Sequence, residues 1–152
     1  MALRSHSSTA VGKYSQKAAD KCVPLDSELI KEAIPLFTQI HHCGSVLAEV
    51  FFAMMISRIL YGSVPAPGTM VIFSVLLATC SIGTPGLPWG TVMVSLGTLT
   101  GILKFGDSGV ALMFAVFALN DAFAAACNAT CDGAAALFLT GYVKRHDFSN
   151  RL

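Results

Sequence analysis

Residues 82–90 read Ile-Gly-Thr-Pro-Gly-Leu-Pro-Trp-Gly, and this stretch decides how the chain folds. A helix is not expected to continue through three glycines and two prolines in nine residues. Proline lacks the backbone N–H that a helix uses for hydrogen bonding, and glycine has no side chain to restrict its backbone. The sequences on both sides, 69–81 and 91–103, are apolar and contain no proline. We therefore expect two short helices that meet at a tight Gly/Pro tip.

The charge pattern places this hairpin in a membrane. The chain of 152 residues is 54% hydrophobic and 12% charged, whereas soluble domains are usually about 25% charged. Residues 59–103 contain no Asp, Glu, Lys, Arg or His. The formal net charge of +1 is too small to suggest nucleic acid as a partner. The lipid bilayer is the expected solvent, and no motif of an enzyme active site is present.

Each arm of the hairpin is too short to cross a bilayer. Thirteen residues extend about 20 Å as a helix, and the hydrocarbon core is about 30 Å thick. The length favours a re-entrant hairpin over 69–103, whose tip lies at membrane depth. Two short tilted spans joined by an ordinary loop are the alternative.

Two other segments, 33–61 and 109–143, exceed the roughly 20 apolar residues of a membrane helix. Since 109–143 is longer than a bilayer requires, we expect part of it to be loop or strongly tilted. Eight of the ten basic residues lie before the first span or after the last, which predicts that both termini are cytoplasmic. The fold class is therefore an all-α, multi-pass protein of the plasma (inner) membrane, with a cytoplasmic tail over 144–152.

The first span contains a short polar stretch at its centre, His41-His42-Cys43-Gly44-Ser45. Polar groups at this depth are tolerated only where they are buried in protein or line a wet cavity. The segment therefore reads as a broken helix.

The last span carries a polar stripe. Asp121, Asn128 and Asp132 are spaced i, i+7, i+11, which places them on one helix face among Ala, Leu, Phe and Val. Carboxylates at mid-membrane are costly, so the stripe favours a binding face or a proton site. A pair of polar residues that only join helices is the alternative.

In this order, the features resemble the C-terminal transport core of the sodium:dicarboxylate symporters, from about Ser5 to Lys144. The resemblance implies that 1–32 is the second arm of a first hairpin with a serine-rich tip, followed by the broken helix, the full hairpin and the final helix. Pro35-Leu36 resembles the start of the family's broken helix, and residues 41–45 take the place of its Asn-Met-Asp-Gly-Thr motif.

The resemblance also assigns roles to individual residues. It implies a solute site and a cation site near the membrane midplane, with Na⁺ or H⁺ as the coupling ion and no other cofactor. The solute site would comprise Ser7, Ser8, Thr84, Pro85, Gly86, Asp121, Ala125 and Asn128. The cation site would comprise Gly44, Ser45, Asn128 and Asp132.

The departures from the family are informative. His41 and Cys43 stand where the family has oxygen ligands for sodium, which makes His41 and His42 candidate proton sites. Ala124 stands where carriers of acidic substrates have an arginine, so a small neutral solute, such as a small amino acid, fits better than a dicarboxylate.

Other functions stay open. Relative to the family, one hairpin arm and six helices are missing, so the chain could be a fragment that pairs with an N-terminal half on another chain, a non-transporting remnant, or part of a homotrimer when complete. A metal-binding membrane protein is a further alternative, because His41, His42 and Cys43 are soft ligands and Cys127 and Cys131 share a helix face.

Overall fold

The computed structural model describes residues 8–21, 27–84 and 90–146. This part of the chain is helical and contains no strand. The helices are α2 (Ser8–Ala19), α3 (Ser27–Ile40), α4 (Cys43–Tyr61), α5 (Pro67–Ile82), α6 (Gly90–Gly101) and α7 (Asp107–Arg145).

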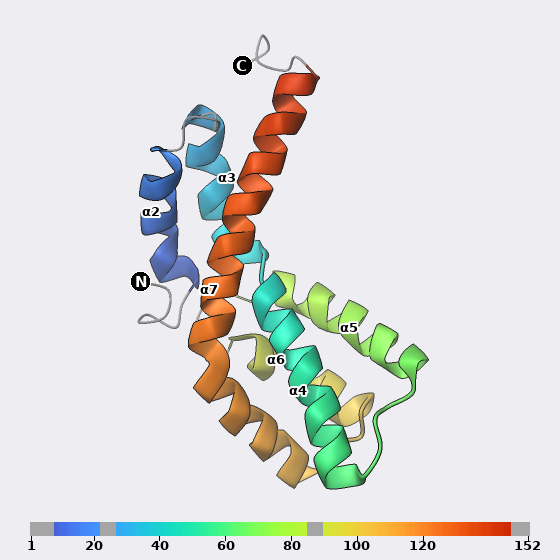
Figure 1. The fold of residues 1–152 in the computed structure, drawn as a ribbon. Coiled ribbons are helices and arrows are strands. Elements are labelled where there is room, and N and C mark those ends of the chain that lie inside the picture. The colour runs from blue at the N-terminus through green and yellow to red at the C-terminus, as the bar shows by residue number, and fades with distance from the viewer. Residues whose placement is uncertain (1–7, 22–26, 85–89, 147–152) are drawn as a thin grey trace.

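Helix α7 is the longest helix of the described residues, and α3 and α4 lie antiparallel to it, one after the other (Figure 1). At one end, Ile30 and Ile34 of α3 pack with Ala136 of α7. At the other, the hydroxyl of Tyr61 accepts a hydrogen bond of 2.9 Å from the backbone N–H of Gly106, just before α7 begins. The junction of α3 and α4 therefore lies beside the middle of α7.

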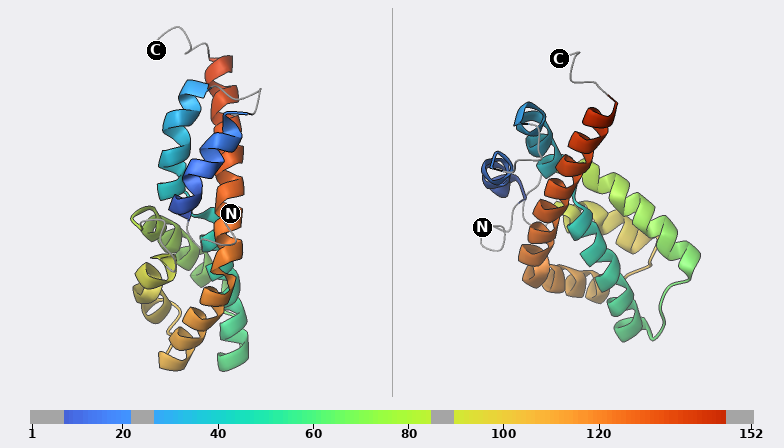
Figure 2. Two further views of the ribbon diagram at one scale, coloured as in Figure 1. Left: turned by 90° about the vertical axis from the view of Figure 1, so that its left-hand side faces the viewer. Right: turned by 45° about the horizontal axis from the view of Figure 1, so that its top comes forward.

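Helices α5 and α6 form a hairpin that packs against α4, as two views of the molecule show (Figures 1 and 2). Its apolar contacts with α4 and α7 form the main core, from Ala53, Ile56, Phe73, Leu77, Val92, Leu99, Met113 and Phe117. The segment that follows α6 lies beside Tyr61, whose ring centroid is 5.5 Å from that of Phe105, while the last turn of α5 reaches back to the α3–α4 junction. At 1.5 Å per residue the arms are about 24 and 18 Å long.

Helix α2 lies against α3 and α7 at the opposite end from the hairpin. Gly12 in its first half faces Thr38, near the end of α3, where an added Cβ would lie 3.1 Å from the hydroxyl oxygen. The N-terminal end of α2 is thus directed toward the α3–α4 junction.

Two stretches are long and apolar enough to cross a membrane: Glu28–Tyr61, which includes the junction, and Asp107–Arg145, with mean hydropathies of 1.7 and 1.9. Helix α5 is apolar but shorter. Large apolar side chains face outward from α4 and α5, among them Leu47 at 72% and Val71 at 63% exposure. Such faces suit lipid rather than water.

The boundaries differ from expectation at two places. Helix α3 begins at Ser27, not at residue 33, because Ile30 and Ile34 are buried against α7 and this packing stabilises the helix before residue 33. Pro35 therefore lies inside the helix. Of the two expectations for 109–143, loop or tilt, the structure rules out the loop, since α7 is one continuous helix of 39 residues. Its length is accommodated by packing against α3 and α4 in succession.

Candidate functional site

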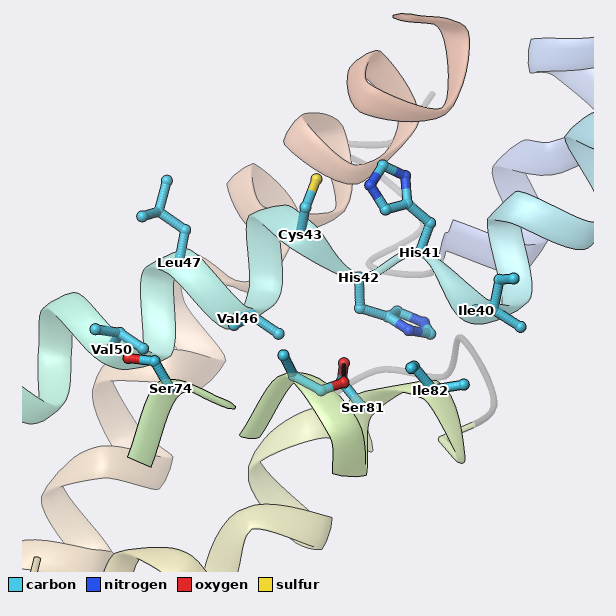
Figure 3. Close-up of a pocket in the computed structure, with 11 residues that line it drawn as sticks. Ile40, His41, His42, Cys43, Val46, Leu47, Val50, Ser74, Ser81 and Ile82 are labelled. Atoms are coloured by element: carbon cyan, nitrogen blue, oxygen red, sulfur yellow. Dashed lines mark hydrogen bonds between the residues drawn. The ribbon is translucent and has the colours of Figure 1, made fainter. Parts of the chain in front are cut away.

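The break between α3 and α4 consists of two residues, His41 and His42. The N–H of His41 closes α3 by bonding to the carbonyl of Phe37 at 2.8 Å, and the carbonyl of His42 opens α4 by accepting from Val46 at 2.9 Å. Because the chain is not helical here, neighbouring side chains diverge. Figure 3 shows His41 and Cys43 on one side of the break and His42 on the other, toward α5.

Asn128 caps the start of α4 from a different helix. Its Oδ1 accepts from the N–H groups of Gly44 at 2.7 Å and Ser45 at 3.2 Å, and its Nδ2 donates to the Ser45 hydroxyl at 3.0 Å. His42, at the N-cap position, supplies no side-chain cap. A helix N-terminus leaves unpaired donors, so Asn128 satisfies two groups that the break would otherwise leave buried and unbonded.

Gly44 brings the backbones of α4 and α7 into direct contact. A Cβ at this position would lie 2.5 Å from Cβ of Cys127 and 2.7 Å from the carbonyl oxygen of Ala124. The glycine therefore serves close packing rather than the break itself, which occurs two residues earlier.

His41 and Asp132 form a pair across the same junction. The distance from Nδ1 of His41 to Oδ1 of Asp132 is 3.0 Å. The Asp132 side chain is fully buried, whereas His41 is 36% exposed. Oδ2 of Asp132 has no hydrogen-bond partner among the described residues. The imidazole therefore contacts only one of the two oxygens of this buried carboxyl group.

A second polar contact joins α4 to the hairpin. Ser95 of α6 donates a hydrogen bond to Oε1 of Glu49, and both residues are fully buried. The sequence analysis singled out neither Glu49 nor Ser95. The lone serine in an apolar arm carried no signal that could have distinguished it from a core residue.

The stripe on α7 is buried as its spacing predicts. Asp121, Ala125, Asn128 and Asp132 are all at most 5% exposed. The structure brings Asn128 and Asp132 together with residues 41–45, and Asp121 lies about two turns before Asn128 on the same face.

The structure does not show the other predicted solute residues in contact with the stripe on α7. Thr84 is buried, and its hydroxyl donates to the carbonyl of Ser81 at 2.6 Å, which ends α5. Ser8 is the first residue of α2, at the end directed toward the junction. Ser7, Pro85 and Gly86, and the side chain of Ser8, lie outside the described residues.

The soft ligands do not assemble into a metal centre in the part of the chain that the structure describes. No group of three or more His, Cys, Asp or Glu side chains is placed to hold an ion there. The alternative of a metal-binding protein therefore gains no support.

A family model described as the sodium:dicarboxylate symporter family matches residues 1–141. The chain belongs to the sodium:dicarboxylate symporter family. No curated protein and no solved structure matches it. Membership of this symporter family, with the two apolar helical stretches, identifies a membrane protein with a transporter-like function.

The junction in this member of the sodium:dicarboxylate symporter family is joined to α7 by two kinds of polar contact. The contacts of Gly44 and Ser45 with Asn128 use backbone donors, and the contact with Asp132 uses an imidazole nitrogen. Among the described residues that make these contacts, Asp132 is the one with a carboxyl group.

Proposed function

We propose that this chain forms the solute- and ion-binding core of a secondary transporter that takes up a small neutral solute, such as a small amino acid, together with H⁺. The observation that carries the proposal is the meeting of the α3–α4 break with Asn128 and Asp132. Asn128 is about 31 Å from the start of α7 and about 26 Å from its end, so this meeting point lies near the middle of a membrane helix.

The ligand chemistry favours H⁺ over Na⁺. A hard cation such as Na⁺ prefers oxygen ligands. Here the Asn128 amide oxygen already accepts two backbone N–H groups, and Oδ1 of Asp132 faces a histidine. The His41–Asp132 pair offers a site for one proton: with the proton on the imidazole the pair has no net charge, and without it the pair carries one negative charge. His42 is a second candidate for the proton.

The solute class follows from the polar face of α7. In this proposal Asp121 binds a solute ammonium group, while Ala124 and Ala125 leave no positive charge for a second carboxylate. The N-terminal end of α2, with Ser7 and Ser8, favours an anionic group such as an α-carboxylate. Thr84, Pro85 and Gly86 would close the site from the hairpin.

The hairpin of α5 and α6 is proposed to be re-entrant. Both arms are shorter than the hydrocarbon thickness. The end of α5 is near His42, at the middle of the spanning stretch, and the segment that follows α6 is near Tyr61, at the end of that stretch. The hairpin would therefore enter and leave from one face, with both chain termini at the opposite, cytoplasmic face of the plasma membrane.

The test is uptake of radiolabelled alanine into liposomes that contain the purified chain. We expect uptake when an inward proton gradient is imposed without Na⁺, and at least tenfold less uptake with His41→Gln or Asp132→Asn. Asp107→Asn, at the exposed start of the same helix, is the matched control and should transport normally.

Two results would count against this proposal in different ways. Uptake that follows a sodium gradient at fixed pH would refute proton coupling but not transport. Lack of uptake under either gradient, from correctly folded protein, would refute transport by this chain.

A further inference from the structure

Two thiols are neighbours where α4 begins beside α7. The thiol of Cys43, the first residue of α4, interacts with the thiol of Cys131 on α7. Figure 3 shows the Cys43 side chain on the same side of the break as His41 and away from α5. Both cysteines are free thiols, and both are partly exposed. The proposed transport mechanism gives this pair no role.

The polar contacts on both sides of the pair hold the two cysteines against each other. On one side, Nδ1 of His41 lies 3.0 Å from Oδ1 of Asp132. On the other, the N–H of Gly44 donates to Oδ1 of Asn128 at 2.7 Å. Each cysteine lies between these two contact points in its own helix, and α4 runs antiparallel to α7. The contacts that position one thiol therefore also position the other.

The backbones of α4 and α7 approach closely enough here for a covalent link. A Cβ on Gly44, the residue after Cys43, would lie 2.5 Å from Cβ of Cys127 and 3.0 Å from the backbone nitrogen of Asn128. A disulfide requires Cα atoms about 4.4–6.8 Å apart. Packed helices usually have axes about 8–10 Å apart, so this spacing is reached where two helix backbones nearly touch, as they do at Gly44.

We propose that Cys43 and Cys131 are a modification site for peroxides, which convert the two thiols into a disulfide that joins the break to α7. The sulfur of one thiol attacks an oxygen of hydrogen peroxide, the O–O bond breaks, and the thiol proton leaves with the other oxygen as water. The sulfur of the second thiol then attacks the resulting sulfenic acid. The S–S bond forms, the S–O bond breaks, and the hydroxyl group leaves with the second thiol proton as water. In formal terms each sulfur loses one electron, and each peroxide oxygen gains one.

The surroundings suit this chemistry. Hydrogen peroxide is small and uncharged, so it reaches a partly exposed thiol inside a membrane. The neighbouring thiol then captures the sulfenic acid before a second peroxide molecule oxidises it further. The finished link would hold the first turn of α4 on α7, with the amides of Gly44 and Ser45 at Asn128.

The test treats the purified chain in lipid nanodiscs with hydrogen peroxide, blocks the remaining thiols with N-ethylmaleimide, and maps the digested peptides by mass spectrometry. We expect a linked pair of peptides that contain Cys43 and Cys131 and that together have lost two hydrogen atoms. The link should form at a rate independent of protein concentration, and dithiothreitol should reverse it.

Three variants identify the two sulfurs. Cys43→Ser and Cys131→Ser should each abolish the link. Cys127→Ser, one turn away on α7, is the matched control and should leave it unchanged. A link made mainly through Cys127, or treated protein in which Cys43 and Cys131 both remain free, would overturn the proposal.

Hydrogen exchange tests whether the link holds the break. The amides of Gly44 and Ser45 should exchange more slowly in the oxidised chain and recover after dithiothreitol. Peroxide should leave their exchange unchanged in Cys131→Ser. Equal exchange in the oxidised and reduced chains would contradict a disulfide that fixes α4 on α7. None of these readouts depends on transport, so failure here leaves the proposed function standing, and the reverse also holds.

Discussion

At the scale of single residues, Gly44 determines how closely α4 and α7 approach. The helix breaks at His41–His42, and Gly44 lies inside α4, where its lack of a side chain permits close packing against α7. The contact with Cys127 and Ala124 leaves no room for a methyl group.

Gly44→Ala should therefore destabilise the fold by about 1–3 kcal/mol, because the clash with α7 outweighs the gain in helix propensity. The measurement is unfolding in detergent, followed by circular dichroism. Gly133→Ala is the matched control on α7, where an added Cβ meets nothing within 4 Å and should be neutral or stabilising by up to about 1 kcal/mol. Equal stability of the two variants would contradict the close contact.

Asn128, which the sequence analysis assigned to the solute and cation sites, also stabilises the start of α4. Its amide serves as the N-cap of α4, which lacks a cap of its own. Asn128→Ala leaves two buried donors unbonded and should cost about 1–2 kcal/mol or more.

Hydrogen exchange provides the specific readout for this cap: the amides of Gly44 and Ser45 should exchange faster in Asn128→Ala, while Asn128→Asp, which retains acceptor oxygens, should protect them. Asn120→Ala is the control, since its side chain bonds to its own helix at the carbonyl of Val116. Unchanged exchange at 44 and 45 would show that the cap is not needed.

At the scale of elements, the contact between Ser95 and Glu49 ties α6 to α4 inside an otherwise apolar interface. Oε2 of Glu49 has no partner among the described residues, so the serine supplies the bond that this carboxyl group has there. This contact therefore helps to fix the register of the hairpin against α4.

Ser95→Ala should lower the free energy of unfolding by about 1–3 kcal/mol, because it leaves a buried carboxyl group without its hydrogen bond. Ser74→Ala should cost far less, since that hydroxyl only bonds to its own helix. A double-mutant cycle with Glu49→Ala gives the interaction free energy. A coupling indistinguishable from zero would mean that packing alone sets the register.

At the scale of the whole molecule, the arrangement predicts the topology. Tyr61 and Gly106 are in contact at one end of the two spanning stretches, and α3 lies beside the last turns of α7 at the other. Loops at 62–66 and 102–106 should therefore face one side of the membrane, and Lys31 and Arg145 the other.

Single cysteines introduced at Ser63, Lys104, Lys31 and Arg145, in a chain whose five natural cysteines are serine, provide the test. A membrane-impermeant maleimide should label the first pair from one side and the second pair from the opposite side. A spin label at Gly83 should report a depth near the bilayer centre. Labelling of position 83 from the face opposite Ser63 would instead indicate two full spans.

Local chemistry determined much of this protein in advance. The absence of charge over 59–103, the Gly/Pro stretch at 82–90 and the spacing of Asp121, Asn128 and Asp132 established an all-helical membrane protein with a hairpin and a polar stripe. These features follow from backbone geometry and helix periodicity, which depend only on near neighbours in the chain.

Only the tertiary structure decided what those polar residues do. Asn128 is 84 residues from Gly44, and Asp132 is 91 residues from His41. No local pattern indicates that one becomes a helix cap and the other a histidine partner, nor that Ser95 meets Glu49. These contacts form because α3, α4 and the hairpin pack along α7, and packing across such separations is set by the shapes of whole helices rather than by any one segment.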